Sequence, residues 1–155
     1  MKLLKGETAS ILLFLLLIVM IQITKGQINT IDLTLDEEAT QTSHNYVLKF
    51  THVQSGQSKI LYSSDVSSFP ERYNKFLIEE TVNEDLLAGK VTLSPTGQWD
   101  YVAYEMPLAS PPSLDITLAY KVVEEGRLFV KDNDESLNVH FDSDDTKDNA
   151  VFDEQ

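Results

Sequence analysis

A long apolar run close to the amino terminus constrains this chain more than any other feature. Residues 8–24 contain no charged side chain, and residues 11–21 contain no polar one. At about 1.5 Å per residue, a helix over residues 8–24 would be roughly 25 Å long, which is the short end of what crosses a bilayer. The sequence therefore predicts a membrane anchor in residues 1–26. Its apolar core consists of Ile11, Leu12, Leu13, Phe14, Leu15, Leu16, Leu17, Ile18, Val19, Met20 and Ile21.

The same run is compatible with a second interpretation, a cleaved signal peptide. An apolar core behind the basic residues Lys2 and Lys5 is typical of such peptides, and Gly26 offers a small residue near a cleavage point. Glu7 in the basic start and Lys25 beside the cut favour the anchor instead. Because positive charges remain on the cytoplasmic side of a membrane, we expect the amino terminus there and the rest of the chain across the membrane.

Composition limits what the remaining residues can do. The chain has 155 residues, a formal net charge of −13 and no cysteine. This length fits one domain with appendages, and the missing thiols exclude disulfides, cysteine-ligated zinc and a thiol nucleophile. Strong negative charge argues against a nucleic-acid partner, because phosphates would be repelled.

Residues 27–131 have the alternating pattern of β-strands. Apolar residues recur at every second position, which places them on one face of a strand. About seven strands follow one another at short spacing, with no convincing amphipathic helix between them. The sequence predicts an all-β fold, an antiparallel β-sandwich of the immunoglobulin-like or jelly-roll-like kind. The clearest alternating sets are Ile31, Leu33 and Leu35; Tyr46, Leu48 and Phe50; and Trp99, Tyr101 and Ala103.

Two turn signals predict hairpins, and the carboxyl-terminal residues predict a tail. Pro95 and Gly97 favour a hairpin turn at residues 94–97, between strands at 91–93 and 99–104. Residues 124–126, Glu-Glu-Gly, predict a last hairpin between residues 119–123 and 127–130. Residues 132–155 are strongly acidic, and we expect them to form a largely disordered, self-repelling tail.

No residue pattern indicates a catalytic, cofactor or metal site. There is no G-x-S-x-G motif, the glycines are scattered singly, and His44 and His52 flank one predicted strand too far apart to share a metal ion. His140 stands alone. Residues 132–136 have the alternate oxygen side chains of a calcium loop, but Leu137 stands where such a loop needs glycine. We predict a protein without enzymatic activity, cofactor or metal, and loose calcium binding by the tail is left open.

The segment over residues 67–76, S-S-F-P-E-R-Y-N-K-F, predicts a rigid structural corner. Pro70 fixes the turn, and the corner residues are Pro70, Arg72, Tyr73 and Phe76. Arg72, one of few arginines in the chain, is expected to form a bidentate pair with a carboxylate and so tie the corner to the sandwich.

Three stretches together carry a resemblance to a known group of proteins. They are the corner at residues 67–76, the stretch L-A-G-K-V-T-L-S-P-T-G-Q-W-D-Y-V-A-Y-E at residues 87–105, and E-E-G-R-L-F-V at residues 124–130. They resemble small β-rich virion structural proteins of bacteriophages and prophages of Bacteroidetes hosts. The similarity covers about residues 28–131 and brings no catalytic residue with it. It implies capsid or spike proteins as partners and cyclic homo-oligomers, trimers or pentamers.

These observations give one leading hypothesis and one alternative. The leading hypothesis is a non-enzymatic phage virion structural protein, a membrane-anchored β-sandwich that contacts capsid or spike proteins and lies at an internal or host-derived membrane. The alternative is an exported bacterial binding module of the periplasm or cell envelope, whose signal peptide is cleaved. A mature chain that begins at Gln27 would support export, whereas Met1 or Lys2 would support anchoring.

Overall fold

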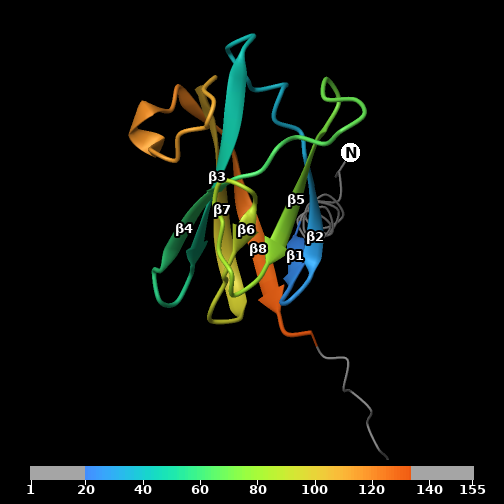
Figure 1. Cartoon of the computed structure of the whole chain (residues 1–155), viewed down its shortest axis with the longest axis vertical. Coiled ribbons are helices and arrows are strands. Elements are labelled where there is room, and N and C mark those ends of the chain that lie inside the picture. Colours follow the sequence, from blue (N-terminus) through green and yellow to red (C-terminus); the bar gives the residue numbers. More distant parts are fainter. Residues whose placement is uncertain (1–19, 134–155) are drawn as a thin grey trace, which may run out of the picture.

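The computed structural model describes residues 20–133, which form an all-β fold of two sheets packed face to face around one core (Figure 1). The one helical element among these residues is a short 3-10 turn, η1. The elements are β1 Ile21–Thr24, β2 Ile28–Leu33, β3 His44–His52, β4 Ser58–Tyr62, β5 Asn74–Glu80, β6 Lys90–Val91, β7 Gly97–Pro107, η1 Ile116–Leu118 and β8 Lys121–Lys131. Residues 11–19 of the predicted apolar core, which spans residues 11–21, lie outside the described residues. So does nearly all of the predicted tail at residues 132–155.

The two sheets are mixed, which corrects the prediction of a purely antiparallel fold. The larger sheet has the strand order β1-β8-β7-β3-β4, and the smaller one has the order β2-β5-β6. Neighbouring strands are antiparallel except for β1 beside β8 and β5 beside β6, which are parallel. In the first of these pairs the chain enters the sheet along its own last strand, so the whole domain acts as the crossover connection that a parallel pair needs.

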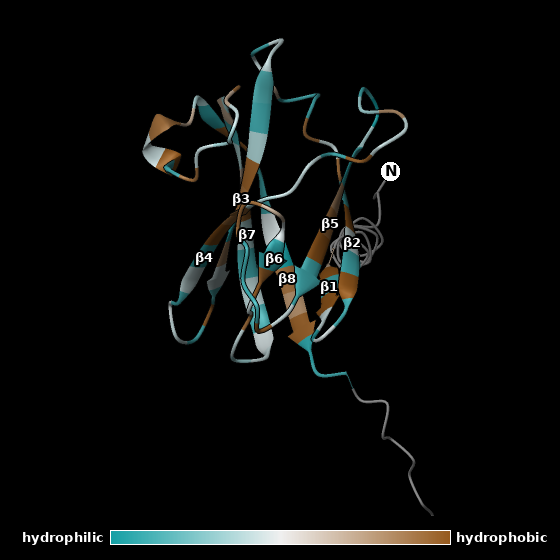
Figure 2. Cartoon of the chain, in the orientation of Figure 1, coloured by the Kyte–Doolittle hydropathy of each residue, from teal (hydrophilic) through white to brown (hydrophobic). Residues whose placement is uncertain are grey.

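The core confirms the alternation read from the sequence. Every residue of the three alternating sets is buried, and Trp99 and Tyr101 are among the largest fully buried side chains. In Figure 2 hydrophobic and hydrophilic bands follow one another along the longer strands. Since residues two apart on a strand face the same side, each strand presents its apolar set to the opposite sheet.

Strand β1 lies in the segment that the sequence analysis assigned to the amino-terminal anchor. Ile21 pairs with Leu128, Ile23 is fully buried in the core, and the Lys25 backbone N–H donates to the Lys131 carbonyl oxygen at 2.9 Å. The folded part of the chain therefore includes β1 and extends upstream of residue 27. Met20, which is partly exposed, directly precedes this strand. Between residues 20 and 133 we find no helix with the length and apolar character that a membrane span requires.

Both predicted hairpins are wrong, for different reasons. Residues 94–97 do not close a hairpin: Gly97 is the first residue of β7, and the segment before it connects β6 in the smaller sheet with β7 in the larger one. Residues 124–126 form no turn, because β8 continues through them as one strand of eleven residues. Gly126 is needed there because it lies opposite Tyr101, and a Cβ atom at Gly126 would come within 2.8 Å of the Tyr101 ring.

Candidate protein-binding groove

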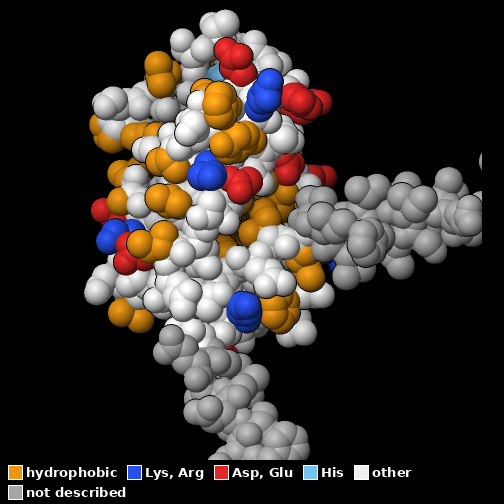
Figure 3. Space-filling model, turned by 90° about the vertical axis from the view of Figure 1, so that its right-hand side faces the viewer, with side chains coloured by type: hydrophobic (Ala, Val, Ile, Leu, Met, Phe, Trp, Pro, Cys, Tyr) orange, Lys and Arg blue, Asp and Glu red, His pale blue; other side chains and the backbone are white. Residues whose placement is uncertain are grey.

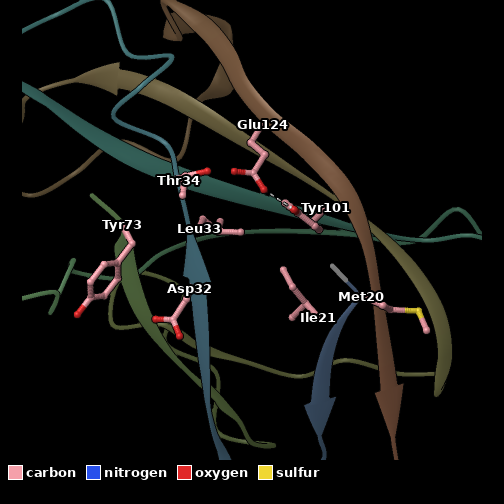
Figure 4. A pocket seen from close by; sticks show the side chains of 8 residues that line it. All are labelled: Met20, Ile21, Asp32, Leu33, Thr34, Tyr73, Tyr101 and Glu124. Atoms are coloured by element: carbon pink, nitrogen blue, oxygen red, sulfur yellow. Dashed lines mark hydrogen bonds between the residues drawn. The ribbon is translucent and has the colours of Figure 1, made fainter. Parts of the chain in front are cut away.

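An open groove lies between the two sheets, beside the first residue of β1 (Figure 4). Its volume is about 390 Å³. The side chains that line it come from five segments of the chain, so the fold rather than any local motif assembles it. They are Met20, Ile21, Asp32, Leu33, Thr34, Tyr73, Tyr101 and Glu124.

Within residues 20–133, β1 pairs with only part of β8. β1 has four residues and β8 has eleven, and the pairing joins Ile21–Thr24 to the last four residues of β8. Beside residues 122–127 of β8, the described part of the chain supplies no strand on that side. Met20 and Ile21, at the start of this pairing, line the groove.

One wall of the groove is fixed by a hydrogen bond from Tyr101 to Glu124. The Tyr101 hydroxyl donates to Glu124 Oε1 at 2.6 Å (Figure 4). Burial, followed by this bond and the charge of the carboxylate, raises the pKa of Tyr101 above its ordinary value. The phenol is therefore a fixed neutral donor, and with Gly126 beneath its ring it forms a rigid wall.

The rim of the groove is acidic. Asp32 and Glu124 are its charged lining residues, and no lysine or arginine is among the lining residues that the structure describes. Lys75 approaches Asp32 only at 4.0 Å, and the Lys75 side chain is partly exposed while that of Asp32 is largely exposed, so this pair neutralises the carboxylate weakly. Ile21 and Leu33 form an apolar floor, and the two carboxylates lie at the rim. This arrangement suits a ligand that has an apolar group beside a positively charged one.

The side of the molecule around β2 and β5 has a different character. Figure 3 shows this side, where hydrophobic side chains are interspersed with acidic and basic ones. Lys90 and Glu79 form an ion pair there at 2.9 Å, with both side chains partly exposed. Such mixed, solvated surface is ordinary for a soluble protein, and it does not compete with the groove as a candidate site.

A polar cluster at one end of the fold has the residue types of a catalytic site, but its contacts fix a loop. Glu105 is fully buried, and its oxygens accept the backbone N–H groups of Gln41 at 2.7 Å and Thr40 at 3.0 Å. Burial alone would raise the pKa of Glu105, but these N–H donors outweigh it and the pKa is lowered. His44 lies 3.8 Å from Glu105 and 3.7 Å from Asp36. The cluster thus holds the loop before β3 in place.

In the predicted corner the Arg72 N–H donates to the Phe69 carbonyl oxygen at 2.9 Å, and a residue other than Arg72 ties the segment to the sheets. Arg72 is exposed and has no ion pair within residues 20–133, so the expected bidentate contact is wrong. Asn74 is buried instead, where its side chain accepts the Leu35 N–H at 2.9 Å and donates to Asp65 at 2.9 Å. A short amide fits this buried position. A guanidinium would have to leave water to occupy it, and the loss of its hydration would be costly.

The residues predicted for the corner have separate roles. Phe76 is buried in the core, and its ring meets that of Tyr46 edge-on at 6.4 Å. Tyr73 lines the groove, while Pro70 lies exposed at the surface. One of the four predicted corner residues is therefore part of the candidate site.

The two described histidines lie at the ends of β3, as the sequence predicts. His52 is buried, packs against Trp99 with ring centroids 5.0 Å apart, and bonds to Ser55 at 2.9 Å. No group of three metal-ligating side chains comes together within residues 20–133. His140 and most of the calcium-like stretch lie outside the described residues.

Sequence reasoning missed most of the groove. Asp32 and Glu124 look like solvated acids in the sequence, and Gly126 looks like a turn residue. The available signal was the alternation of Ile21 and Ile23, which matches a strand and was hidden in the apolar run. In comparisons with known proteins, no protein-family model matches the sequence, and a search of curated proteins gave no match.

Proposed function

We propose that this chain is a non-enzymatic protein-binding module of a bacteriophage particle, held at a membrane by its apolar amino-terminal segment, and that the groove receives a capsid or spike protein. The observation that carries the binding role is the groove, which has an apolar floor and an acidic rim. Pockets with a mainly apolar lining and a few fixed polar groups are the usual places where proteins bind their ligands. The virion assignment is supported by the sequence resemblance.

We also propose that the fold is immunoglobulin-like rather than jelly-roll-like. The order β8-β7-β3, with β4 beside β3, corresponds to the order of strands G, F, C and C′ in immunoglobulin variable domains. The pairing of β2 with β5 corresponds to strands B and E. Proteins of this kind often bind partners through strand edges and loops on a rigid scaffold, which agrees with the position of the groove.

The position of β1 supports an anchor over a signal peptide that is cut after Gly26. A cut there would remove β1, with the fully buried Ile23, and would leave residues 128–131 of β8 without this neighbouring strand. Sequencing of the mature amino terminus tests this point. A chain that retains Met1 or Lys2 supports the anchor, and a chain that begins at Gln27 supports the exported bacterial module.

Photo-crosslinking in purified particles tests the binding role. The crosslinking residue p-benzoylphenylalanine replaces Thr34, which lines the groove, or Thr30, an exposed threonine of the same segment outside the groove. We expect the position-34 variant to join a capsid or spike protein at least several-fold more than the position-30 variant. Mass spectrometry that finds no copy of this chain in particles would refute the virion assignment, and equal crosslinking from both positions would refute the groove.

A further inference from the structure

The outer face of the larger sheet, which is turned away from the core, carries charges of both signs. Successive residues of a strand point to opposite faces, and Leu48, Tyr101 and Leu128 point into the core. The residues that alternate with them therefore point outward. On β3, β7 and β8 these outward residues include Lys49, Asp100, Val102, Glu125, Arg127 and Phe129.

The strand register arranges these charges in two neighbouring rows. In the first row, Lys49 of β3, Val102 of β7 and Glu125 of β8 lie side by side. In the second row, one step further along the face, Asp100 of β7 lies beside Arg127 of β8. On β8 the charge changes from negative in the first row to positive in the second. The two rows together have no net charge, so a second copy of this chain, whose net charge is −13, is not repelled by them.

The chain itself makes little use of these charges. Lys49 and Glu125 form no ion pair within residues 20–133. Arg127 approaches Asp100 only at 3.9 Å, and their side chains are 74% and 54% exposed, so this pair is weak. An open hollow of about 420 Å³ lies at the same place, lined by Asp100, Tyr101, Val102, Glu125, Gly126 and Arg127. The face thus offers solvated charges around a recess.

Apolar side chains lie at both ends of the two rows, and a loop stands over one end. Val122, which is 45% exposed, lies beyond the first row, and Phe129 lies beyond the second. The loop at residues 108–120 folds toward the end of the face beyond Val122, where the Asn45 side chain donates to the Ala109 carbonyl oxygen at 3.1 Å (Figure 1). Two copies packed with their strands in opposite directions would keep these loops apart, at opposite ends.

We propose that two copies of this chain bind each other through the outer face of the larger sheet, with their strands in opposite directions and a two-fold axis between the two rows. The first row of one copy then faces the second row of the other. Glu125 of each copy meets Arg127 of the other copy, and Lys49 of each copy lies near Asp100 of the other. The change of sign along β8 is what makes this face complementary to itself.

Apolar contacts complete the same arrangement. The rows on either side of the axis exchange places, so Val122 of one copy faces Phe129 of the other. Burial of these side chains favours association, and the charge pairs fix the register. This contact goes beyond the proposed function and uses a surface other than the groove. It needs no free edge of β8, because β3 and β7 have described strands on both sides.

Sedimentation equilibrium of the full chain in density-matched detergent micelles tests the dimer. We expect a monomer–dimer equilibrium with a dissociation constant of about 100 μM or less. Glu125→Arg and Arg127→Glu each place like charges opposite one another twice, and each should weaken the dimer about tenfold or more. In an equimolar mixture of the two variants, opposite charges face each other again. The mixed dimer, and the dimer of the double variant, should return to within about threefold of the unsubstituted chain.

Matched control variants lie on the smaller sheet. Glu79→Arg and Lys90→Glu make the same changes of charge at partly exposed positions away from the outer face, and both should leave the dissociation constant within about threefold. Denaturant unfolding, followed by the fluorescence of Trp99, shows whether each variant folds. If a single variant does not fold, the unsubstituted chain and the double variant still decide the outcome.

Several results would overturn the proposal. A chain that stays monomeric up to about 1 mM would show that this face binds no second copy. A trimer or pentamer would show a cyclic contact in place of a two-fold one. Association that neither single variant weakens would place the contact elsewhere, the apolar amino-terminal segment included. Loss of the dimer in both single variants without recovery in the mixture would exclude the pairing of Glu125 with Arg127. Crosslinking from position 34 reports on the groove and stands apart from all of these results.

Discussion

The outer edge of β8 has two halves that share one strand and differ in what covers them. The closed half, residues 128–131, is paired with β1, and Ile23 fills the core behind it. The open half, residues 122–127, contributes Glu124 to the groove, and Gly126 there lies against the Tyr101 ring. Within residues 20–133, one half of this edge thus borders the core and the other half borders the groove.

The carboxylates of the two halves differ in the same way. Beside the closed half, Glu80 is buried, and its oxygens accept the Gly26 N–H at 2.8 Å and the Leu93 N–H at 3.1 Å. Beside the open half, Glu124 accepts one tyrosine hydroxyl, and Asp32 is exposed. Saturated carboxylates hold a fold together, whereas partly satisfied ones are available to a partner.

The largest effect is expected from emptying the core behind the closed half. Ile23→Ala removes a fully buried side chain, so the free energy of unfolding should fall by about 2–5 kcal/mol. Ile28→Ala is the control, because Ile28 is 66% exposed and its loss should be nearly neutral. Denaturant unfolding followed by the fluorescence of Trp99 measures both. Equal, small changes would show that β1 contributes no more than a surface strand.

The second effect concerns the buried carboxylate of the closed half. Glu80→Ala leaves the Gly26 and Leu93 N–H groups without an acceptor, which should cost about 1–3 kcal/mol of unfolding free energy. The neighbouring Glu79 is the matched control, since its ion pair with Lys90 is partly exposed and Glu79→Ala should cost less than about 1 kcal/mol. A larger loss for Glu79→Ala than for Glu80→Ala would contradict the contrast between the two kinds of carboxylate.

The open half should be sensitive to alkaline pH. The pKa of Tyr101 is raised in the folded state, so above about pH 10 the unfolded chain releases a proton that the folded chain keeps. The free energy of unfolding must then fall as pH rises, by up to about 1.4 kcal/mol per pH unit for this tyrosine. Tyr46, whose pKa is also raised, adds its own share. Unfolding at several pH values between about 9 and 11 should give a shallower decline for Tyr101→Phe; an unchanged slope would contradict the assignment.

The smallest effect is expected from the same substitution at neutral pH. Tyr101→Phe keeps the ring against Gly126 and removes the bond to Glu124, whose carboxylate is half-buried and can turn to water. We expect a loss of roughly 0.5–1.5 kcal/mol. Tyr104→Phe serves as the control, because no hydrogen bond of the Tyr104 hydroxyl occurs within residues 20–133. Thermal unfolding measures both, and a loss for Tyr101→Phe as large as that for Glu80→Ala would erase the difference between the two halves.

How far the sequence predicts this molecule depends on the range of the interaction. The alternation of Tyr46, Leu48 and Phe50 predicts a buried strand face because burial and period are both local properties. The identity of neighbouring strands is not local, which is why residues 94–97 were predicted as a hairpin turn and in fact join two sheets. Gly126 was misread because the reason for glycine is the Tyr101 ring on another strand.

The groove could not be predicted from the sequence, because it too depends on contacts between distant segments. Its lining comes from β1, β2, the corner, β7 and β8. No sequence pattern indicates that any two of these segments are in contact. Strand β1 was hidden because a continuous apolar run satisfies both a membrane helix and a buried strand, and Ile21 belongs to both descriptions. The corner could be located from Pro70, but its tie is Asn74, whose partners lie on distant segments.

The parallel arrangement of β1 and β8 has a mechanical consequence. β1 begins at the end of the pair where the chain enters, and β8 finishes at the opposite end. Tension applied between Met20 and Lys131 would slide the two strands along each other, so that their backbone bonds bear the load together instead of opening one after another. A chain attached at its start and pulled from its finish would thus resist through β1, a strand of only four residues.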